Sequence, residues 1–458
     1  MFPRPSPRRV VAASALVAAI AILILGPIEP AATNRAFAIA VLSIGLWATG
    51  VVAEHVAALI FFAAAMLLGA GPAGTVFAGF QSAALWLIIS GLVMGVAVNR
   101  TGLGKRLARR MVQLFGARYG GLIAGAIAMG LALSFVMPSS MGRVVLLMPI
   151  ALAMADGLGF AKGSNGHTGL VVATALGAFV PPFGLLTANV PNLVMIGASE
   201  EAFGYTPLYG TWFALHFPLL GLGKAVAIAV IILALFPDRA TATPAALGEP
   251  EPMTAAERRL LVILIFALGG WATDFLHHVS PAWIGLVAAI ACLMPRIGAL
   301  EQADFGKINV SSIFYVAGIL GLGAVMAESG VADLVARWVL DLAPLDPARP
   351  AANFAALILA GMAIALGTTL PALPAVMTPI SGQLAAASGF SLEVVLMIQV
   401  LSFSVPILPY QAPPLMVTIQ LGGVSLRDCA KPVLALTAIS LLVLFPLDFL
   451  WWRLLGWI

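Results

Sequence analysis

Two apolar stretches of the chain are interrupted by short polar segments that contain glycine, and these interruptions limit the possible folds more than any other feature. The first is residues 138–143, Pro-Ser-Ser-Met-Gly-Arg, within apolar sequence that runs from Leu122 to Leu158. The second is residues 367–371, Gly-Thr-Thr-Leu-Pro. A bilayer tolerates polar residues and non-helical backbone at mid-depth only where protein encloses them. Paired interruptions in two halves of a chain therefore indicate the binding site of a transporter.

The composition agrees with a membrane location. Of the 458 residues, 61% are hydrophobic and 9% are charged, and the mean hydropathy is +1.06. Such values are typical of polytopic membrane proteins and leave no room for a separate soluble catalytic domain. Cys292 and Cys429 have no motif spacing, so they predict neither a disulfide framework nor a metal cluster. No basic face with interleaved aromatic residues indicates nucleic acid, so we expect a small-molecule substrate and membrane lipid as partners.

Apolar runs bounded by charge, Gly or Pro predict an all-α polytopic membrane protein. We expect about eleven transmembrane helices and two re-entrant hairpins, arranged as two inverted-topology repeats. The predicted divisions are an uncleaved N-terminal helix in 1–35, a first repeat in 36–236, a linker in 237–258 and a second repeat in 259–458. The hairpins are expected at 119–157 and 352–388, the broken helices at 168–199 and 391–424, and an amphipathic surface helix at 101–114.

The placement of Lys and Arg predicts the orientation. With a cytoplasmic N-terminus, most of the 23 Lys and Arg residues fall in cytoplasmic loops, as the positive-inside rule requires. The first hairpin then opens from the cytoplasm and the second from outside. The pairing of segment 188–194 with segment 410–416 supports the repeat in the sequence itself. We expect an alternating-access transporter in a bacterial inner membrane.

At these interruptions the chain resembles the divalent anion/sodium symporter (DASS) family, which belongs to a superfamily that includes arsenite and sodium/proton carriers. The resemblance covers essentially the whole chain. It implies uptake of dicarboxylates, citrate or sulfate, coupled to sodium, by an elevator motion and often in a homodimer. Members of the family carry Ser-Asn-Thr at each hairpin tip. Here Ser139, Ser140 and Met141 take the first position, and either 369–371 or the pair 368–369 takes the second, so both tip asparagines are replaced.

Polar residues around the two breaks make up the candidate site. Broken helices supply sodium ligands from carbonyl groups and from Ser, Thr or Asn side chains, although the same hydroxyls could simply satisfy helix backbone. The residues expected to bind an ion are Ser139, Ser140, Gly142, Thr187, Asn189, Thr369 and Gln411. The residues expected to bind substrate are Ser139, Ser140, Arg143, Asn192, Thr368, Thr369 and Pro414. Beyond a possible sodium ion we expect no cofactor and no metal.

Arg143 is the most informative single residue in the sequence. An intramembrane arginine is costly unless it faces water, a partner or an anion, and its planar fork suits carboxylate or sulfate. We hypothesise that its fixed charge partly replaces a bound sodium; the alternative is a structural ion pair, with Asp156 as a partner. Lys224 is expected to snorkel or to pair with a carbonyl group. Asp274 is either a proton site or a solvated interfacial group.

The predicted function is therefore secondary active transport of small anions, with sodium coupling and an elevator-type mechanism. The alternatives are a sodium/proton antiporter, a metalloid-oxyanion carrier, or a sodium-independent anion exchanger. The sequence has no Walker motif, no GxSxG elbow, no HExxH and no CxxC, so neither ATP-driven transport nor an enzyme is expected. A membrane enzyme or a scaffold would need a clustered set of catalytic carboxylates, histidines or metal ligands.

Overall fold

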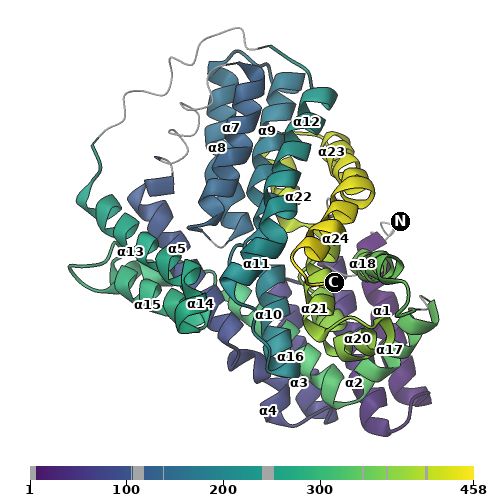
Figure 1. The fold of residues 1–458 in the computed structure, drawn as a ribbon. Helices are drawn as coiled ribbons and strands as arrows, with labels where there is room; N and C mark the ends of the chain where they lie inside the picture. Colours follow the sequence, from purple (N-terminus) through teal and green to yellow (C-terminus); the bar gives the residue numbers. More distant parts are fainter. Residues whose placement is uncertain are drawn as a thin grey trace, which may run out of the picture.

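The computed structural model describes residues 7–104, 106, 118–137, 139–239, 252–342, 345–367, 370–407 and 411–458. Within these ranges every regular element is a helix and none is a strand, which confirms the predicted all-α class (Figure 1). Most of the expected surface helix at 101–114 and the central part of the linker lie outside the described residues.

Seven helical segments of the described chain are long and apolar enough to cross a bilayer. They are α2 (Ala31–Thr49), α5 (Ala83–Thr101), α8 (Ser140–Gly157), α9 with η2 (Asn165–Gly184), α11 to α12 (Tyr209–Leu235), α16 (Val310–Glu328) and α23 to α24 (Leu426–Leu454). Five further apolar helices are shorter than a full membrane span when only residues with described side chains are counted. They are α1 (Pro7–Leu25), α3 (Glu54–Leu68), α7 (Tyr119–Ser134), α15 (Pro281–Leu293) and α18 (Pro350–Gly367). With these shorter helices and the bent pair Leu373–Ser388 and Leu392–Phe403, the described spans agree with the predicted polytopic fold.

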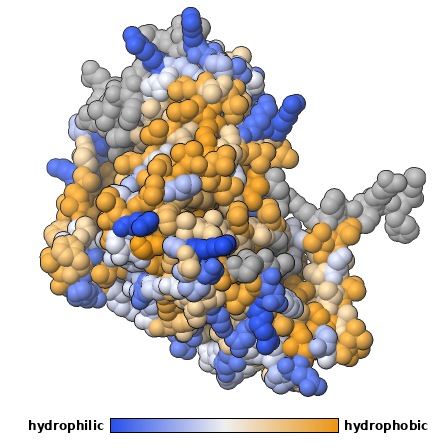
Figure 2. Space-filling view, turned by 45° about the vertical axis from the view of Figure 1, so that its right-hand side comes forward, coloured by the Kyte–Doolittle hydropathy of each residue, from blue (hydrophilic) through white to orange (hydrophobic). Residues whose placement is uncertain are grey.

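The outer surface of the molecule is apolar over much of the face shown in Figure 2. Phe266, Leu276, Val287 and Leu442 are each more than two-thirds exposed. In water, contiguous apolar surface of this extent would be an aggregation site, whereas lipid tails solvate it. The chain is an integral membrane protein.

The remaining elements are short helices and the parts of broken spans. They are α4 (Ala73–Val76), η1 (Ala78–Phe80), α10 (Val190–Phe203), α13 (Ala255–Ala272), α14 (Asp274–His277), η5 (Gln302–Lys307), α17 (Val331–Leu342), α19 (Leu373–Met377), η6 (Thr378–Ile380), α20 (Ser381–Ser388), α21 (Leu392–Phe403) and α22 (Pro413–Gly422). Two π-helices complete the set, η3 (Phe217–Gly223) between α11 (Tyr209–His216) and α12 (Lys224–Leu235), and η8 (Ser440–Leu444) between α23 (Leu426–Ile439) and α24 (Phe445–Leu454).

The first predicted hairpin range, 119–157, contains α7 and α8, which both pack against α9 at one end of the molecule (Figure 1). The helical path then breaks after Phe179 and resumes with α10 at Val190. Pro181, Pro182 and Pro191 lie in or just after this break. Because proline lacks an N–H and clashes with the preceding turn, these residues account for the interruption.

The second predicted hairpin range, 352–388, contains most of α18 together with α19 and α20, and α18 packs against α21. Here α21 ends at Phe403 and α22 begins at Pro413. The two halves of the chain then exchange partners. Helix α22 packs against α8 and α9 of the first half, and α10 packs against α19 of the second half. A continuous core therefore joins the two breaks.

Asp274 has a structural role that differs from both sequence expectations. It is fully buried, and its carboxylate accepts hydrogen bonds from the backbone N–H groups of Tyr209 and Gly210. These are the first residues of α11, where N–H groups have no partner within the helix. Asp274 thus caps α11 from outside that helix and is buried rather than solvated.

An ion pair joins Arg106, in the range of the predicted surface helix, to Glu257, at the end of the predicted linker. Arg106 Nε and Nη2 each donate to the carboxylate of Glu257, over 2.9 Å. Glu257 also completes a capping box with Thr254 at the start of α13. The hydrogen bond from the Arg106 guanidinium is the main reason that the pKa of Glu257 lies below its usual value. The pair lies at the end of α13 that follows the linker.

We expect Glu257→Gln to lower the thermal stability by about 1–2 kcal/mol at neutral pH, because it replaces a charge-assisted pair with a neutral amide. Since the folded-state pKa of Glu257 is depressed, its stabilisation is present above the unfolded pKa and is lost as the pH falls through the folded value. The Tm difference between wild type and variant should therefore shrink in acid. Glu29→Gln, at an exposed position, provides a surface control, and a difference that stayed constant into acid would contradict the assignment.

Candidate functional site

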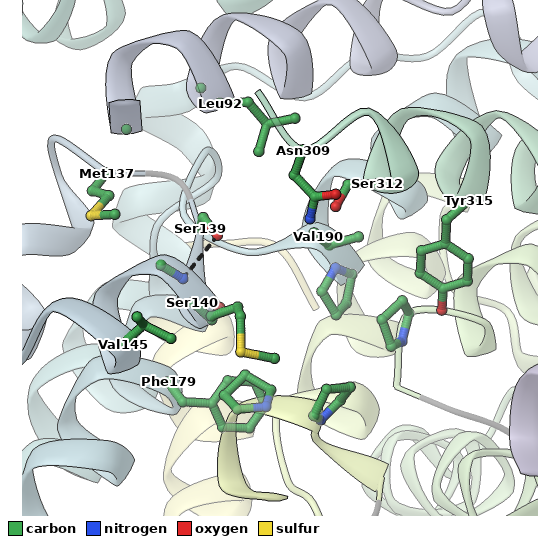
Figure 3. Close-up of a pocket in the computed structure, with 18 of the residues that line it drawn as sticks. Leu92, Met137, Ser139, Ser140, Val145, Phe179, Val190, Asn309, Ser312 and Tyr315 are labelled. Carbon is green, nitrogen blue, oxygen red and sulfur yellow. Dashed lines mark hydrogen bonds between the residues drawn. The ribbon is translucent and has the colours of Figure 1, made fainter. Parts of the chain in front are cut away.

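A cavity of about 400 Å³ lies where the breaks of the two halves meet (Figure 3). One wall is the first hairpin tip, with Ser139, Ser140 and Gly142. A second wall comes from the segments that begin α10 and α22. The third comes from α5 and α16, with Asn309, Ser312 and Tyr315 on the side opposite Ser140 in Figure 3. The cavity thus gathers residues that lie far apart in the sequence.

The first hairpin tip is organised by a helix cap. Ser139 is the N-cap of α8, and its Oγ accepts a hydrogen bond of 3.1 Å from the N–H of Gly142. Ser140 donates from Oγ to Oδ1 of Asn189. A Cβ at Gly142 would meet Met137 Cε at 2.6 Å, so a larger residue there would require the Met137 side chain to move. All three predicted tip residues therefore line the cavity and hold the start of α8 in place.

Arg143 lies behind this wall rather than in the cavity, and its side chain is fully buried. Nε donates to the carbonyl oxygen of Ala178 at 2.9 Å, and Nη1 donates to those of Met137 and of Ala188, the latter at 3.0 Å. Nη2 donates to Oδ1 of Asn189 at 3.0 Å. The expected pairing with Asp156 is not made, because Asp156 is exposed on the outer part of α8. Arg143 therefore joins the hairpin tip to the broken span.

The polar residues of the first break are buried around this guanidinium. Asn189 is fully buried, and its Nδ2 donates to the carbonyl oxygen of Phe179 at 3.4 Å. Asn192 is also buried, and its Nδ2 donates to the carbonyl oxygens of Phe183 and Leu185 at 3.2 and 2.8 Å. Thr187 is buried as well. None of these three lines the cavity, and the amide groups of Asn189 and Asn192 bind backbone carbonyl groups of the break.

The second break contributes Gln411 and Pro414 to the cavity wall. Gln411 Nε2 donates to the carbonyl oxygen of Ala365 at 2.7 Å, and its Oε1 accepts from the N–H of Ile407 at 2.8 Å. It thereby links the end of α18 to the broken span. Thr368 and Thr369 lie outside the described residues, although Leu370 and Pro371, which follow them, line the cavity.

Sequence reasoning missed the face of α16. Asn309, Ser312 and Tyr315 line the cavity at intervals of three residues, so they share one face of the start of this helix. Lys307, Asn99 and Glu54 lie at the same cavity. The signal was present in the sequence, because polar residues at helical spacing open a span that is otherwise apolar. It was overlooked because it does not interrupt the span.

The electrostatic character of the cavity comes from helix ends. The residues that begin α8, α10 and α22 all line it. A helix N-terminus has N–H groups with no partner within the helix and a partial positive charge, equivalent to about half an elementary charge. Pro413 and Pro414 at the start of α22 lack an N–H, and the N–H of Gly142 in α8 is capped by Ser139, so the helix dipole more than free N–H groups supplies the positive potential. The charges of Lys307 and Glu54 at the cavity oppose each other, and the three helix ends favour a negatively charged ligand. This is a geometry suited to a small anion.

The chain matches the family described as the sodium:sulfate symporter transmembrane region, over residues 8–458. It belongs to this family. The match spans both breaks and all the cavity walls. The resemblance to divalent anion/sodium symporters is thereby confirmed, and the chain is a membrane transport protein of an anion-transporting family.

Several named relatives agree with the family assignment. A membrane protein of Cupriavidus necator is 26% identical over 97% of this chain and 92% of its own length. The inner membrane protein YbhI of Escherichia coli K12 is 24% identical over 88% of each chain. The L-tartrate/succinate antiporter of Escherichia coli K12 is 23% identical, over 55% of this chain and 54% of the antiporter. All three are matched at low identity.

One solved structure supports the fold. The crystal structure of the Alcanivorax borkumensis YdaH transporter superposes with a TM-score of 0.55, over 84% of this chain and 88% of that one. The two sequences are 16% identical. The similarity therefore concerns the arrangement of helices alone.

Within this symporter family member, Arg143→Lys tests the role of the guanidinium fork. Lysine keeps the charge but cannot reach the carbonyl groups of Met137, Ala178 and Ala188 and the amide oxygen of Asn189 together. We expect a loss of about 3 kcal/mol in stability, because buried acceptors lose their donor. Thermal unfolding in detergent measures it. Arg118→Lys, at an exposed position on the same hairpin, should change little, and equal effects at both positions would contradict the assignment.

Proposed function

We propose that this chain carries small dianions, of the dicarboxylate or sulfate class, through the cavity between the two breaks. The convergence of three helix N-termini on one cavity carries this proposal, because it concentrates positive potential without a dedicated substrate-binding arginine. The cavity volume of about 400 Å³ suits a small molecule. The tartrate and succinate named for one relative belong to the same chemical class.

The alternative of a sodium/proton antiporter fits the cavity less well. An intramembrane cation site needs acidic ligands or a dense set of oxygens. Among the described residues that line the cavity, Glu54 is the acidic one, and it lies at the start of α3, away from the hairpin tip. A metalloid oxyanion remains within the proposed anion class and is a competing substrate to be assayed.

We further propose that Arg143 takes the place of a sodium ion in the first half. The sodium ligands expected there were the oxygens of the hairpin tip and of the first break. The guanidinium engages the carbonyl oxygens of Met137 and Ala188 and the side-chain oxygens of Ser140 and Asn189. Because the Arg143 side chain is a permanent cation in this position, it favours anion exchange in which the first half binds no sodium. This moves the proposal from sodium symport towards the sodium-independent exchanger.

The route of substrate follows from the loops that line the cavity. Glu54, Asn99 and Lys307 fall at the cytoplasmic ends of their helices in the predicted topology, which places the N-terminus in the cytoplasm. The cavity on this reading is open inward. Its walls combine α8, α10 and α22 with α5 and α16, and we propose that the first group moves past the second in an elevator motion. By family resemblance, contacts within a homodimer would keep α5 and α16 fixed in the membrane.

Ser312→Ala tests the substrate contact. Ser312 lines the cavity, and removing a hydrogen bond to a charged ligand costs about 1–2 kcal/mol, or about a fivefold or larger increase in KM. Uptake of radiolabelled sulfate and succinate into proteoliposomes measures the change. Ser311→Ala, one residue earlier on α16 and outside the cavity wall, is the matched control. Equal KM values in both variants would contradict the assignment of the cavity.

Arg143→Ala tests the resident cation. Removing the side chain leaves carbonyl and amide oxygens around a space that a sodium ion can fill. We expect this variant to gain a sodium-dependent stabilisation of about 1–3 kcal/mol over wild type, measured as Tm in sodium against choline. Arg118→Ala is the control. If sodium stabilised wild type and variant equally, the replacement hypothesis would be wrong.

A further inference from the structure

A second buried polar cluster lies outside the cavity, where α11 and α12 meet α24. It contains His216, the last residue of α11, Lys224, the first residue of α12, and Asp448 on α24. All three side chains are 0% exposed. Ionisable groups inside a membrane protein are expensive and normally mark a functional position.

The polar atoms of this cluster are unusual because many have no hydrogen-bond partner among the described residues. They are Nδ1 and Nε2 of His216, Oδ1 and Oδ2 of Asp448, and Nε1 of Trp452, whose ring lies 5.6 Å from that of His216. A buried polar atom without a partner costs about 1–3 kcal/mol. Native structures contain few such atoms, and each needs a reason. The concentration of these atoms in one place indicates a site whose partner is not a protein group.

Lys224 connects the cluster to the second break. Its Nζ donates to the carbonyl oxygen of Ser404 at 2.9 Å and to Ser404 Oγ at 2.6 Å. Ser404 is the C-cap of α21, the helix that ends at the break. A positive charge at a helix C-terminus also compensates the helix dipole. Lys224 thus ties α12 to the helix that precedes Gln411.

Asp448 is the opposite charge near Lys224, and the two interact electrostatically without a direct ion pair in the described chain. The Phe445 ring lies 5.5 Å from Lys224 Nζ. A buried carboxylate with no hydrogen bond is costly, so the observed arrangement suits the neutral acid. Of the other ionisable groups on these helices, Tyr209 stacks on Trp271 and Arg453 is exposed.

Irregular helix surrounds this cluster on both sides. The π-helix η3 separates His216 from Lys224, and the π-helix η8 begins at Ser440 and leads into α24, which carries Asp448. Such π-helical turns are rare and occur frequently at functional sites. The sequence Phe-Pro-Leu follows His216 and recurs at residues 445–447, directly before Asp448. Both copies of this repeated element therefore meet at the cluster.

We propose that Asp448, His216 and Lys224 form a proton-binding site that controls the second break through Lys224. With Asp448 protonated, Lys224 stays on Ser404 and the end of α21 is held. When Asp448 releases its proton to water, the carboxylate attracts Lys224 and the hold on Ser404 weakens. The proton is taken up from solvent on one side of the membrane and released to solvent on the other, with His216 as the neighbouring acceptor, so one proton crosses in each cycle. This inference rests on the proposed anion transport and adds a proton linkage to it.

Infrared spectroscopy of the purified protein tests the proton site without any substrate. Near neutral pH, where exposed carboxyl groups are ionised, wild type should show a carboxylic acid C=O band that disappears on titration to alkaline pH. Asp448→Asn should remove this band, whereas Asp341→Asn, at an exposed position on α17, should keep it. Asp448→Glu, which preserves the carboxyl group and the fold, should shift its frequency. A band unchanged in both Asp448 variants would overturn the proposal.

Transport across a pH gradient tests the linkage. Sulfate is the probe, because its own charge is constant over the range. For one proton per cycle, a gradient of one pH unit should change sulfate accumulation about tenfold in wild type and in Asp341→Asn. Asp448→Asn and Lys224→Met should remove this response. Transport that ignores the gradient in wild type would overturn the linkage, whereas failure to carry any sulfate or succinate would reject the proposed function and leave the infrared test standing.

Discussion

The pairing of backbone groups at the two breaks is the constraint on which the rest of this structure depends. A helix that stops inside a membrane leaves N–H and C=O groups that lipid cannot satisfy. In the first half Arg143 supplies the donors, to Met137, Ala178 and Ala188. In the second half Gln411 serves as donor and acceptor, to Ala365 and Ile407. Each residue ties a hairpin to a broken span, so the breaks are rigid enough to form a cavity.

The electrostatics of the cavity follow from the same interruption. A continuous span would leave its polar ends at the membrane surface, whereas a broken one places an N-terminus at the break. Because α22 packs on α8 and α10 packs on α19, the helix N-termini that the break in each half creates lie against the other half. The partial charges at α8, α10 and α22 therefore act on one volume. An anion site of this kind needs few specialised side chains, which permits wide variation in sequence at the tips.

Much of the fold and of the cavity wall could be predicted from the sequence, because apolar composition indicates membrane helices and proline indicates where they break. Ser139, Ser140, Gly142, Gln411 and Pro414 all line the cavity as expected of site residues. Reasoning from residue type failed where orientation mattered. Arg143 was expected to meet an anion and instead faces carbonyl groups, and Asp274 caps a helix far along the chain. The direction in which either side chain points cannot be predicted from residue spacing in the sequence, because it depends on contacts between distant segments.

The two breaks are held together by different chemistry. The first break is held by a guanidinium, and the second by a neutral amide with a lysine on the preceding helix end. In the repeat alignment Gln411 corresponds to Asn189, which is itself a partner of Arg143. A fixed charge inside one half cannot leave with the substrate, so that half contributes a constant potential to both conformations. Under the proposed mechanism, an ion that drives transport would act on the second half, where Lys224 holds Ser404 from outside the cavity.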